Sequence, residues 1–532
     1  MNNVELTVRM LERAGVRWVF GVPSGPVLPF IEALRQSNSI DFVLTASETS
    51  AGFMAEAIGR LTGIPGVCVS TVGPGATNLT TGVGGAYLDR SPVIAITCDY
   101  VRAQFGRRTQ MYIDHQALFA PLTKASYLIE DGHVAETIAR ALAQAVAEPP
   151  GPIHLDFPED VGVAEATESP QDTIAPSPVP APPADLGERV EAALRNAERP
   201  LVVTGLTFTR AKAPEALLRF INTQQVPFVT TLHAKGFLPE SQAAGLGVMG
   251  RARRTDVKRM IDQADLVIAV GFDPIEIDYE DWLGDIPLVH LSTEPVQPGT
   301  QAIVAYQATG DIDAILAKIG ALPPVENAWD RDSWAIHRKT LHDNLRPTSA
   351  KLATHQVLDV LRAELAADAV LTYDVGAHTH QIATQWQTDL PHTAVATNGW
   401  SSMGYGMPSA YAAKLARPDR QVVGIVGDGG FQMTAGELAT VRRLGLCVPI
   451  IVLNDGWLGL MKVKQERLGN SESASVLGEP IAPPAHYFGV PVRAVRSRTE
   501  LADAIRWGLS LNGPSVIEAF VDVEPYSKTV FD

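Results

Sequence analysis

The strongest constraint on this chain is a pair of apolar runs that each end on a polar residue. The first run, Val422–Val426, leads into the Gly-Asp-Gly-Gly turn of residues 427–430, and the second, Ile450–Leu453, leads into Asn454. The 24 residues between Gly429 and Asn454 leave room for a crossover helix. Such a strand–helix–strand unit places the two strands in parallel, with their ends at the same edge of one sheet.

Asp428 and Asn454 are therefore expected side by side at the carboxyl edge of this sheet, where open α/β sheets bind ligands. Their oxygens, together with glycines at 429 and 430 that let a group lie close to the backbone, suit Mg²⁺ carrying a diphosphate. The pattern is also compatible with a strand-end turn in which Asn454 caps the next helix. The spacing and the strand context together favour the metal site.

Composition limits the possible classes of protein. The chain has 532 residues, so we expect three or four domains, and 46% apolar residues are enough for several cores. A net charge of −16 without a Lys/Arg-rich run argues against nucleic acid and anionic membranes as partners. Three scattered cysteines suit a reducing cytoplasm. We expect a cytoplasmic protein with no signal peptide and no membrane-spanning helix.

Apolar runs alternate with helical patterns along the chain, which predicts parallel sheets with helices on both faces. We expect an α/β protein of three doubly wound domains, at residues 1–165, 187–325 and 351–532. A proline-rich linker at 166–186 and a polar linker at 326–350 join them. The expected strands include Trp18–Val22, Val67–Val72, Val93–Thr97, Ile153–Phe157, Leu201–Thr204, Pro227–Thr231, Leu266–Val270, Leu288–Leu291, Val370–Tyr373 and Ser515–Ala519.

This order of units and the Gly-Asp-Gly to Asn segment resemble the thiamine-diphosphate (ThDP) enzymes, and overall their acetolactate-synthase-like large subunits. The resemblance covers nearly the whole chain. It implies pyrimidine-binding, central and diphosphate-binding domains, in that order. It also implies that Asp428, Asn454 and the main-chain carbonyl of Gly456 hold Mg²⁺, with Gly429 and Gly430 beside the cofactor.

In the pyrimidine-binding domain the resemblance assigns the catalytic glutamate to Glu48. This carboxylic acid would hydrogen-bond the ring N1′ of the cofactor, whose own amino group then removes the C2 proton. Many relatives have His-Glu here, whereas this chain has Ser47-Glu48. The alternative is an ordinary acid at a helix N-terminus, stabilised by the helix dipole.

Other motifs continue the resemblance. The glycine loop at 70–79 would line the cofactor pocket with Gly75 and Asn78, although it also suits a tight strand–helix turn. In the third unit, backbone amides at a helix start can hold diphosphate. The residues assigned there are Val375, Gly376, Ala377 and His378, and His378 could instead be a helix-capping histidine.

Two further residues match the family more loosely. Met403, next to Ser401, corresponds to the bulky residue that wedges between the two cofactor rings, although a lone methionine is usually core filler. His115 falls where relatives place a polar active-site residue, and it could move protons near neutral pH. It could equally be a hydrogen-bonded surface histidine.

Residues 245–250 spell G-x-G-x-x-G, but they follow polar residues and not an expected strand, so they do not indicate a dinucleotide site. Flavin-containing relatives bind FAD through the central domain. We nevertheless expect FAD to be absent or a structural passenger. The basic residues at 251–259 could meet phosphates, but a solvated helix face accounts for them better.

The resemblance implies ThDP- and Mg²⁺-dependent decarboxylation of a 2-oxo acid, with carboligation to a second carbonyl compound. Ser47 and the Pro23-Ser24-Gly25 turn depart from the family pattern near the reactive side of the cofactor. A simple decarboxylase or a benzaldehyde-lyase-like carboligase therefore stays open, as does a ThDP-binding protein without turnover. The expected partners are the small-molecule 2-oxo acid, the carbonyl acceptor and further copies of the chain, in a homodimer or homotetramer.

Overall fold

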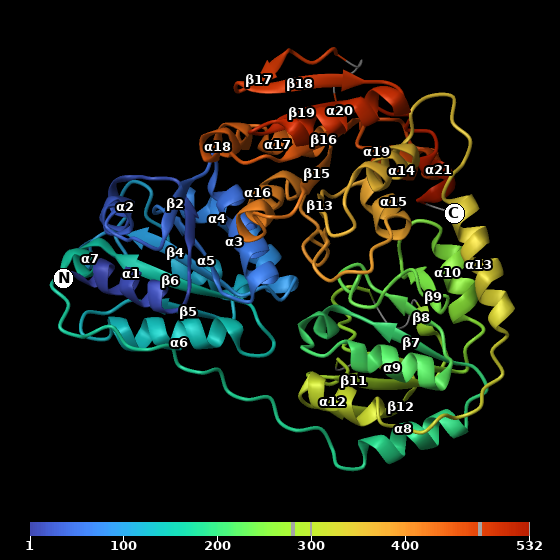
Figure 1. Cartoon of the computed structure of the whole chain (residues 1–532). Coiled ribbons are helices and arrows are strands. Elements are labelled where there is room, and N and C mark those ends of the chain that lie inside the picture. The colour runs from blue at the N-terminus through green and yellow to red at the C-terminus, as the bar shows by residue number, and fades with distance from the viewer. Residues whose placement is uncertain (278–281, 298–300, 477–480, 531–532) are drawn as a thin grey trace.

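The computed structural model describes residues 1–277, 282–297, 301–476 and 481–530. Three α/β units follow one another along the chain, drawn in blue, in green to yellow, and in orange to red (Figure 1). Each unit is a sheet with helices on both faces, which confirms the predicted fold class. Among the described residues, no helix is both long enough and apolar enough to cross a membrane.

The first sheet has the strand order β2-β1-β3-β4-β6-β5, and all of its pairings are parallel. Its strands are β1 Trp18–Gly21, β2 Asp41–Leu44, β3 Gly66–Ser70, β4 Val93–Asp99, β5 Ala125–Leu128 and β6 Pro152–Pro158. Its helices are α1 Asn3–Arg13, α2 Leu28–Arg35, α3 Glu48–Thr62, α4 Pro74–Leu88, α5 His115–Phe119, α6 Val134–Val146 and α7 Glu159–Val163. Alternate residues of β3 face opposite layers, so Val67 and Val69 pack with α1 and α6 while Cys68 packs with α3 and α4.

The second sheet has the order β12-β11-β10-β7-β8-β9. Its strands are β7 Pro200–Thr204, β8 Phe228–Thr230, β9 Gly245–Val248, β10 Leu266–Val270, β11 Leu288–Ser292 and β12 Val304–Thr309. Its helices include α8 Leu186–Arg195, α9 Glu215–Gln224, α10 Arg254–Ile261 and α12 Ile312–Ile319, with a short 3₁₀ helix, η4 Leu206–Arg210, after β7. The G-x-G-x-x-G run begins inside β9, so it is not the turn between a strand and a helix.

The third sheet has the order β14-β13-β15-β16-β19-β18-β17. Its strands are β13 Val370–Tyr373, β14 Ala394–Val395, β15 Val422–Gly427, β16 Pro449–Asn454, β17 His486–Tyr487, β18 Val490–Val495 and β19 Ser515–Phe520. Its helices are α14 Thr354–Glu364, α15 Ala377–Gln385, α16 Gly406–Ala416, α17 Asp428–Thr434, α18 Glu437–Leu444, α19 Gly459–Leu468, α20 Arg498–Ser510 and α21 Tyr526–Thr529. The first six positions repeat the plan of the first sheet, and the short β17 adds an antiparallel edge.

The first and third units share a hydrophobic core although they are far apart in sequence. Helix α16 of the third unit packs along α3 of the first, and Phe53 meets Tyr405 edge to face with ring centroids 5.6 Å apart. The Tyr405 hydroxyl also donates to the buried carboxylate of Glu56 at 2.6 Å. This packing fixes the first and third units of one chain against each other.

Residues 167–183, inside the expected proline-rich linker, form neither helix nor strand, and Figure 1 shows them as a long trace between the first two units. The segment expected as a polar linker at 326–350 contains a helix, α13 Arg331–Asn344, which buries Trp334, His337 and Leu341. A charged helix with only three buried residues is easily taken for a polar linker in sequence.

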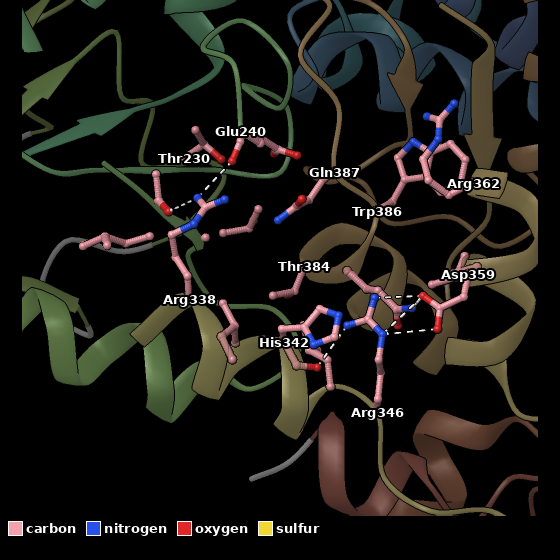
Figure 2. Close-up of a pocket in the computed structure, with 18 of the residues that line it drawn as sticks. Thr230, Glu240, Arg338, His342, Arg346, Asp359, Arg362, Thr384, Trp386 and Gln387 are labelled. Atoms are coloured by element: carbon pink, nitrogen blue, oxygen red, sulfur yellow. Dashed lines mark hydrogen bonds and ion pairs between the residues drawn. The ribbon is translucent and has the colours of Figure 1, made fainter. Parts of the chain in front are cut away.

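Helix α13 lines a cavity of about 160 Å³ between the second and third units (Figure 2). Arg338 donates to the carbonyl oxygens of Glu240, Gln242 and Gly245 at 2.7–3.0 Å. Arg346 reaches α14 and donates to Asp359, with an Nη2 to Oδ1 distance of 2.8 Å. Arg338 of α13 and Arg346, which follows this helix, are thus already engaged by this chain, and the cavity lies at the interface between two units.

Candidate cofactor site

The carboxyl edge of the third sheet gathers three polar side chains. Asp374, Asp428 and Asn454 lie at the ends of β13, β15 and β16, which are neighbouring parallel strands. The predicted placement of Asp428 beside Asn454 at one sheet edge therefore follows from the observed topology. The crossover between β15 and β16 contains two helices, α17 and α18, where a single amphipathic stretch was expected.

Asp428 is a buried carboxylate. Its oxygens accept the backbone N–H groups of Gly429 and Gly456, each at 2.8 Å. Burial, which disfavours the charged form, raises the pKa of Asp428 to about 6. Within the described ranges no Lys, Arg or His forms an ion pair with it. A buried anion of this kind is stabilised strongly by a cation.

Asn454 is held in one orientation. Its Nδ2 donates to Oε1 of Glu518 on β19 at 2.6 Å, whereas its Oδ1 is buried and has no hydrogen-bond partner. An unsatisfied buried oxygen is costly, so this atom is suited to a ligand that the chain itself does not supply. The donor set of Asp428 and Asn454 therefore fits a divalent cation.

Gly456 contributes differently from the two side chains. Its backbone adopts a φ of +78°, and its N–H donates to Asp428. Its carbonyl oxygen, the atom expected to bind the metal, accepts the N–H of Val476 at 2.8 Å. A carbonyl has a second lone pair, but this oxygen is the least available of the three expected ligands.

The start of α15 forms the next part of the site. His378 is buried, its Nε2 has no hydrogen-bond partner, and burial lowers its pKa to about 4. A Cβ placed on Gly427 would lie 3.1 Å from the His378 ring, so the imidazole rests against the end of β15. The N–H groups of Val375 and Gly376 donate to Asp374 and Thr379, both at 2.8 Å. Ala377 is the first residue of the helix.

Met403 lies over the glycines that follow β15. A Cβ on Gly429 would come within 3.1 Å of the Met403 Cε and 2.8 Å of Leu458. The turn before it is strained at Ser401, which has a φ of +51° and donates its hydroxyl to the carbonyl of Asn398 at 2.5 Å. A cavity of about 320 Å³ opens beside Gly429 and is lined by Leu458 and residues 473–476.

Asp374 was not expected as a site residue, yet it organises this turn. Its carboxylate accepts the N–H groups of Gly404 at 2.9 Å and Tyr405 at 3.2 Å, and burial raises its pKa to about 6. A Cβ on Gly430 would lie 1.9 Å from its Oδ2, so a larger residue at 430 would displace this carboxylate. Asp374 ends a strand at the carboxyl edge as Asp428 does, and that signal was available in the sequence.

The first unit carries the second group of predicted residues. Glu48 begins α3 after the N-cap Ser47, is 8% exposed, and accepts the Nδ2 of Asn78 at 3.1 Å. A Cβ on Gly75 would lie 3.3 Å from its Oε1, so the glycine loop touches the carboxylate. The turn before Glu48 is fixed from the third unit, because Glu437 accepts the N–H of Ala46 at 2.8 Å.

His115 is a buried residue, not a surface one. Its Nδ1 lies 3.1 Å from Asp156 and 3.6 Å from Asp99, and its Nε2 accepts the N–H of Gly73 at 3.2 Å. Both ring nitrogens are therefore engaged. Burial and the neighbouring Asp156 raise the pKa of Asp99 to about 6, although His115 opposes this.

Asp99, His115 and Asp156 form a group that could hold a metal ion, because their ligand atoms all lie within 4.8 Å of one another. The hydrogen bond to Gly73 argues against this. A metal at Nδ1 would leave the proton on Nε2, where it would face the N–H of Gly73 donor to donor. The neutral tautomer with the proton on Nδ1 satisfies every partner. Asp99 and Asp156, on β4 and β6, were not predicted from the sequence to be site residues.

The predicted residues thus fall into two groups in one chain. The first unit holds Glu48, Gly75, Asn78 and His115. The third holds Val375, Gly376, Ala377, His378, Ser401, Met403, Asp428, Gly429, Gly430, Asn454 and Gly456.

Three protein-family models match this chain in sequence. The N-terminal TPP binding domain of thiamine pyrophosphate enzymes matches residues 1–118, the central domain matches 188–319, and the C-terminal TPP binding domain matches 374–519. Thiamine pyrophosphate is another name for ThDP. The chain is 30% identical to a probable acetolactate synthase large subunit of Methanocaldococcus jannaschii, over 98% of this chain and 92% of that protein. The chain belongs to the ThDP enzyme family, in its acetolactate-synthase-like group.

Two further relatives are similar to this chain over almost its full length. An acetolactate synthase of Bacillus subtilis is 31% identical and covers 97% of this chain and 93% of its own length. The acetolactate synthase isozyme 2 large subunit of Escherichia coli is 30% identical, with 98% and 96% covered. The chain is therefore a ThDP-dependent enzyme. The alternative of a ThDP-binding protein without turnover finds no support among these relatives.

Proposed function

We propose that this enzyme decarboxylates a 2-oxo acid and joins the product to a second carbonyl compound, with Mg²⁺ as its metal. The observation that supports this best is the unpartnered Oδ1 of Asn454 beside the buried carboxylate of Asp428. Oxygen donors of this kind suit Mg²⁺, which usually takes one or two protein ligands together with phosphate oxygens. The relatives named above are acetolactate synthases, which makes carboligation the first expectation.

In this proposal each predicted residue has a role at the cofactor. Asp428 and Asn454 hold the metal, and Gly456 contributes its carbonyl once the bond to Val476 is shared. His378 meets the diphosphate, because its buried Nε2 has no partner in the chain. The remaining diphosphate contacts fall to Gly429 and Gly430 and to the backbone of Val375, Gly376 and Ala377. The N–H groups of Gly429, Val375 and Gly376 donate to side chains of this chain, so their contacts with the diphosphate require these hydrogen bonds to be shared or exchanged.

The reactive half of the cofactor would lie between Met403 and the first-unit residues. ThDP, when bound, supplies the carbon nucleophile that attacks the keto group. Met403, seated over Gly429, would support the bent shape of the cofactor, with Ser401 fixing the turn. Glu48 would hold a proton at the pyrimidine ring, and Asn78 and Gly75 position its carboxyl group.

We infer that His115 contributes by position and does not itself transfer protons. Its Nε2 accepts the N–H of Gly73, and Gly73-Pro74-Gly75 leads directly to the contact with Glu48. The bond between His115 and Asp156 fixes the ring in turn. A histidine engaged at both nitrogens and only 1% exposed has no free atom for a substrate.

A simple 2-oxo acid decarboxylase and a benzaldehyde-lyase-like carboligase remain candidates, because Ser47 and Ser24 depart from the family near the reactive side. Release of CO₂ from a panel of purified 2-oxo acids, with and without added aldehyde or ketone acceptors, separates them. We expect CO₂ release together with a carbon–carbon bonded product. An aldehyde as the only product would support the simple decarboxylase. No CO₂ release from any acid would contradict the proposal.

We propose that the active enzyme is a homodimer or homotetramer. In this family the pyrimidine-binding domain of one subunit faces the diphosphate-binding domain of another. Several large apolar side chains near the two groups are more than a third exposed, which is consistent with a surface that a second copy covers. These are Leu28, Leu44, Met111, Trp400, Met433 and Met461.

We further propose that the central domain does not use FAD. Open α/β sheets bind ligands at the switch point of their strand order, here between β7 and β10. At that place Glu276 accepts the N–H of Leu206 at 2.7 Å and of His233 at 3.3 Å. The Glu276 carboxylate thus already accepts the backbone N–H groups that a phosphate of FAD would need at this place. A yellow protein with stoichiometric flavin would contradict this.

A further inference from the structure

One helix of the third unit holds the backbone segment that leads to Glu48 in the first unit. This helix is α18, and only residues 435 and 436 separate it from α17, which begins at Asp428. Figure 1 shows α18 where the orange third unit meets the blue first unit. Within one chain, α18 therefore joins the segment that carries the proposed metal ligand to the segment that carries the proposed catalytic acid.

Glu437 is the first residue of α18 and makes the central contact. Its Oε1 accepts the N–H groups of Ala46 at 2.8 Å and of Ser47 at 3.2 Å, and these two residues directly precede Glu48. The helix approaches closely, because a Cβ on Gly436 would lie 3.1 Å from the Ala46 Cβ. Ser47 in turn is the N-cap of α3. Glu437 thus holds the backbone at the point where α3 begins.

Two more residues of α18 bind the same segment slightly earlier in the chain. Arg443 Nη2 and Thr440 Oγ1 both donate to the carbonyl oxygen of Leu44, at 2.7 Å and 3.3 Å. Together with Glu437 they recur every three residues, so they occupy neighbouring positions along the helix surface. The apolar side of α18 packs into the core that the first and third units share. The helix is therefore fixed itself and can hold residues 44–47 in one position.

The carboxyl group of Glu437 acts here as a hydrogen-bond acceptor and not as one half of an ion pair. It is 1% exposed, and within the ranges that the structure describes no Lys, Arg or His forms an ion pair with it. Burial raises the pKa of Glu437, although the hydroxyl groups of Thr440 and Ser50 and the bound N–H groups oppose this. Residues 44–47 therefore need an acceptor oxygen at this position, which the amide of a glutamine also offers.

We propose that Glu437 is a positioning residue for the catalytic acid, because through the N–H groups of Ala46 and Ser47 it sets where Glu48 meets the pyrimidine ring of the cofactor. This role depends on the proposed part of Glu48 in catalysis. Asn78 and the glycine loop hold the carboxyl end of Glu48, whereas Glu437 holds the backbone from which that side chain projects. Position matters, because a misplacement of about 1 Å can cost about 10²-fold in rate.

Exchange of the C2 hydrogen of bound ThDP for deuterium tests this role without any substrate, at saturating ThDP and Mg²⁺. In Glu437→Ala the N–H groups of Ala46 and Ser47 lose their acceptor, so we expect exchange to slow by about tenfold to 100-fold. In Glu437→Gln the amide oxygen still accepts them, so exchange should stay within about threefold of the unchanged enzyme. Melting temperature and ThDP affinity are measured in parallel. A purely structural role would lower these in Glu437→Ala without slowing exchange at saturation.

A second variant serves if Glu437→Ala does not fold. Thr440→Val combined with Arg443→Met removes both donors to the Leu44 carbonyl, and it should slow exchange in the same direction. Arg442→Met is the matched control at the neighbouring exposed position. In the described part of the chain Arg442 donates no hydrogen bond to residues 44–47, so this variant should exchange at the unchanged rate.

Glu48→Gln is measured beside these variants, so that the roles of Glu48 and Glu437 can fail separately. If Glu48→Gln slows exchange while Glu437→Ala, or the double variant in its place, exchanges at the unchanged rate, Glu437 does not position Glu48. Equal loss in Glu437→Ala and Glu437→Gln would also contradict the proposal, because glutamine keeps the acceptor. An unchanged rate in Glu48→Gln would overturn the proposed role of Glu48, and the role of Glu437 with it.

Discussion

Glu518 fixes the amide of Asn454 by accepting its Nδ2 at 2.6 Å, and this leaves the Asn454 Oδ1 buried and without a partner. The two residues lie on adjacent parallel strands, β16 and β19, so the arrangement is built into the sheet. Glu518 therefore sets which atom of Asn454 faces the proposed metal. Partners that orient a metal ligand in this way are often worth 10–100-fold in affinity.

Replacement of Glu518 tests this arrangement. In Glu518→Ala the Asn454 amide loses its anchor and can turn, so we expect Mg²⁺ affinity to fall about tenfold or more. Glu518→Gln is the matched control, because its amide oxygen still accepts the Asn454 Nδ2, and it should retain most of the affinity. Calorimetric titration of Mg²⁺ in the presence of ThDP gives both values. Equal affinity in Glu518→Ala and the unchanged protein would show that Glu518 does not orient a ligand.

Mg²⁺ affinity should depend on pH through Asp428. Burial raises the pKa of Asp428 to about 6 in the folded protein, compared with about 3.9 for an ordinary aspartate. Below pH 6 the carboxyl group is protonated and a metal must displace the proton. Affinity should therefore rise as pH increases through 6, and binding near pH 6 should release protons.

Calorimetry in two buffers with different protonation enthalpies counts these protons. Asp428→Asn, which carries no charge at any pH, is the control, and its residual affinity should lose this dependence. Identical Mg²⁺ affinity at pH 5 and pH 7.5 in the unchanged enzyme would remove Asp428 from the metal site.

His115 should behave as a positioning residue. In His115→Gln the amide can still accept the N–H of Gly73 and donate to Asp156, so we expect most of the turnover and an unchanged pH profile of kcat. His115→Leu keeps the size but leaves Asp99 and Asp156 buried without their partner, so stability should fall and the KM for ThDP should rise. If His115→Gln abolishes turnover while ThDP affinity and melting temperature stay unchanged, His115 transfers protons directly.

Chains inactivated in different halves of the site should restore one another. Glu48→Ala removes the proposed catalytic acid, and Asp428→Ala removes the proposed metal ligand. If each site takes Glu48 and Asp428 from different subunits, mixing the two variants under subunit exchange should give partial activity. A monomer that is fully active in sedimentation experiments would contradict this account.

The sequence predicted the strands that are fully buried. The runs Leu266–Val270 and Val370–Tyr373 match β10 and β13 to the residue, because fully buried parallel strands read as continuous apolar segments. Strands β12 and β18 were not expected, because they are partly exposed and carry mixed polar residues. Helix α13 escaped notice for a similar reason.

The candidate site was predictable where one strand end brings a residue to the sheet edge, as for Asp428 and Asn454. Contacts between distant segments were not. Nothing local to His115 shows that it is buried between Asp99 and Asp156, and nothing near Asn454 points to Glu518. Asp89 of the first unit contacts His233 of the second and the N–H of Gly399 of the third, and these contacts also require three units to be in place at once.

The most direct test of the proposed chemistry is the exchange of the C2 hydrogen of bound ThDP for deuterium in Glu48→Gln. Glutamine fills the same space beside Asn78 and Gly75, so ThDP should bind almost normally. It cannot supply the carboxyl proton to the pyrimidine ring, so C2 exchange should slow by about 10²–10⁴ relative to the unchanged enzyme. Exchange at the unchanged rate in a variant that binds ThDP normally would remove Glu48 from the mechanism and contradict the account.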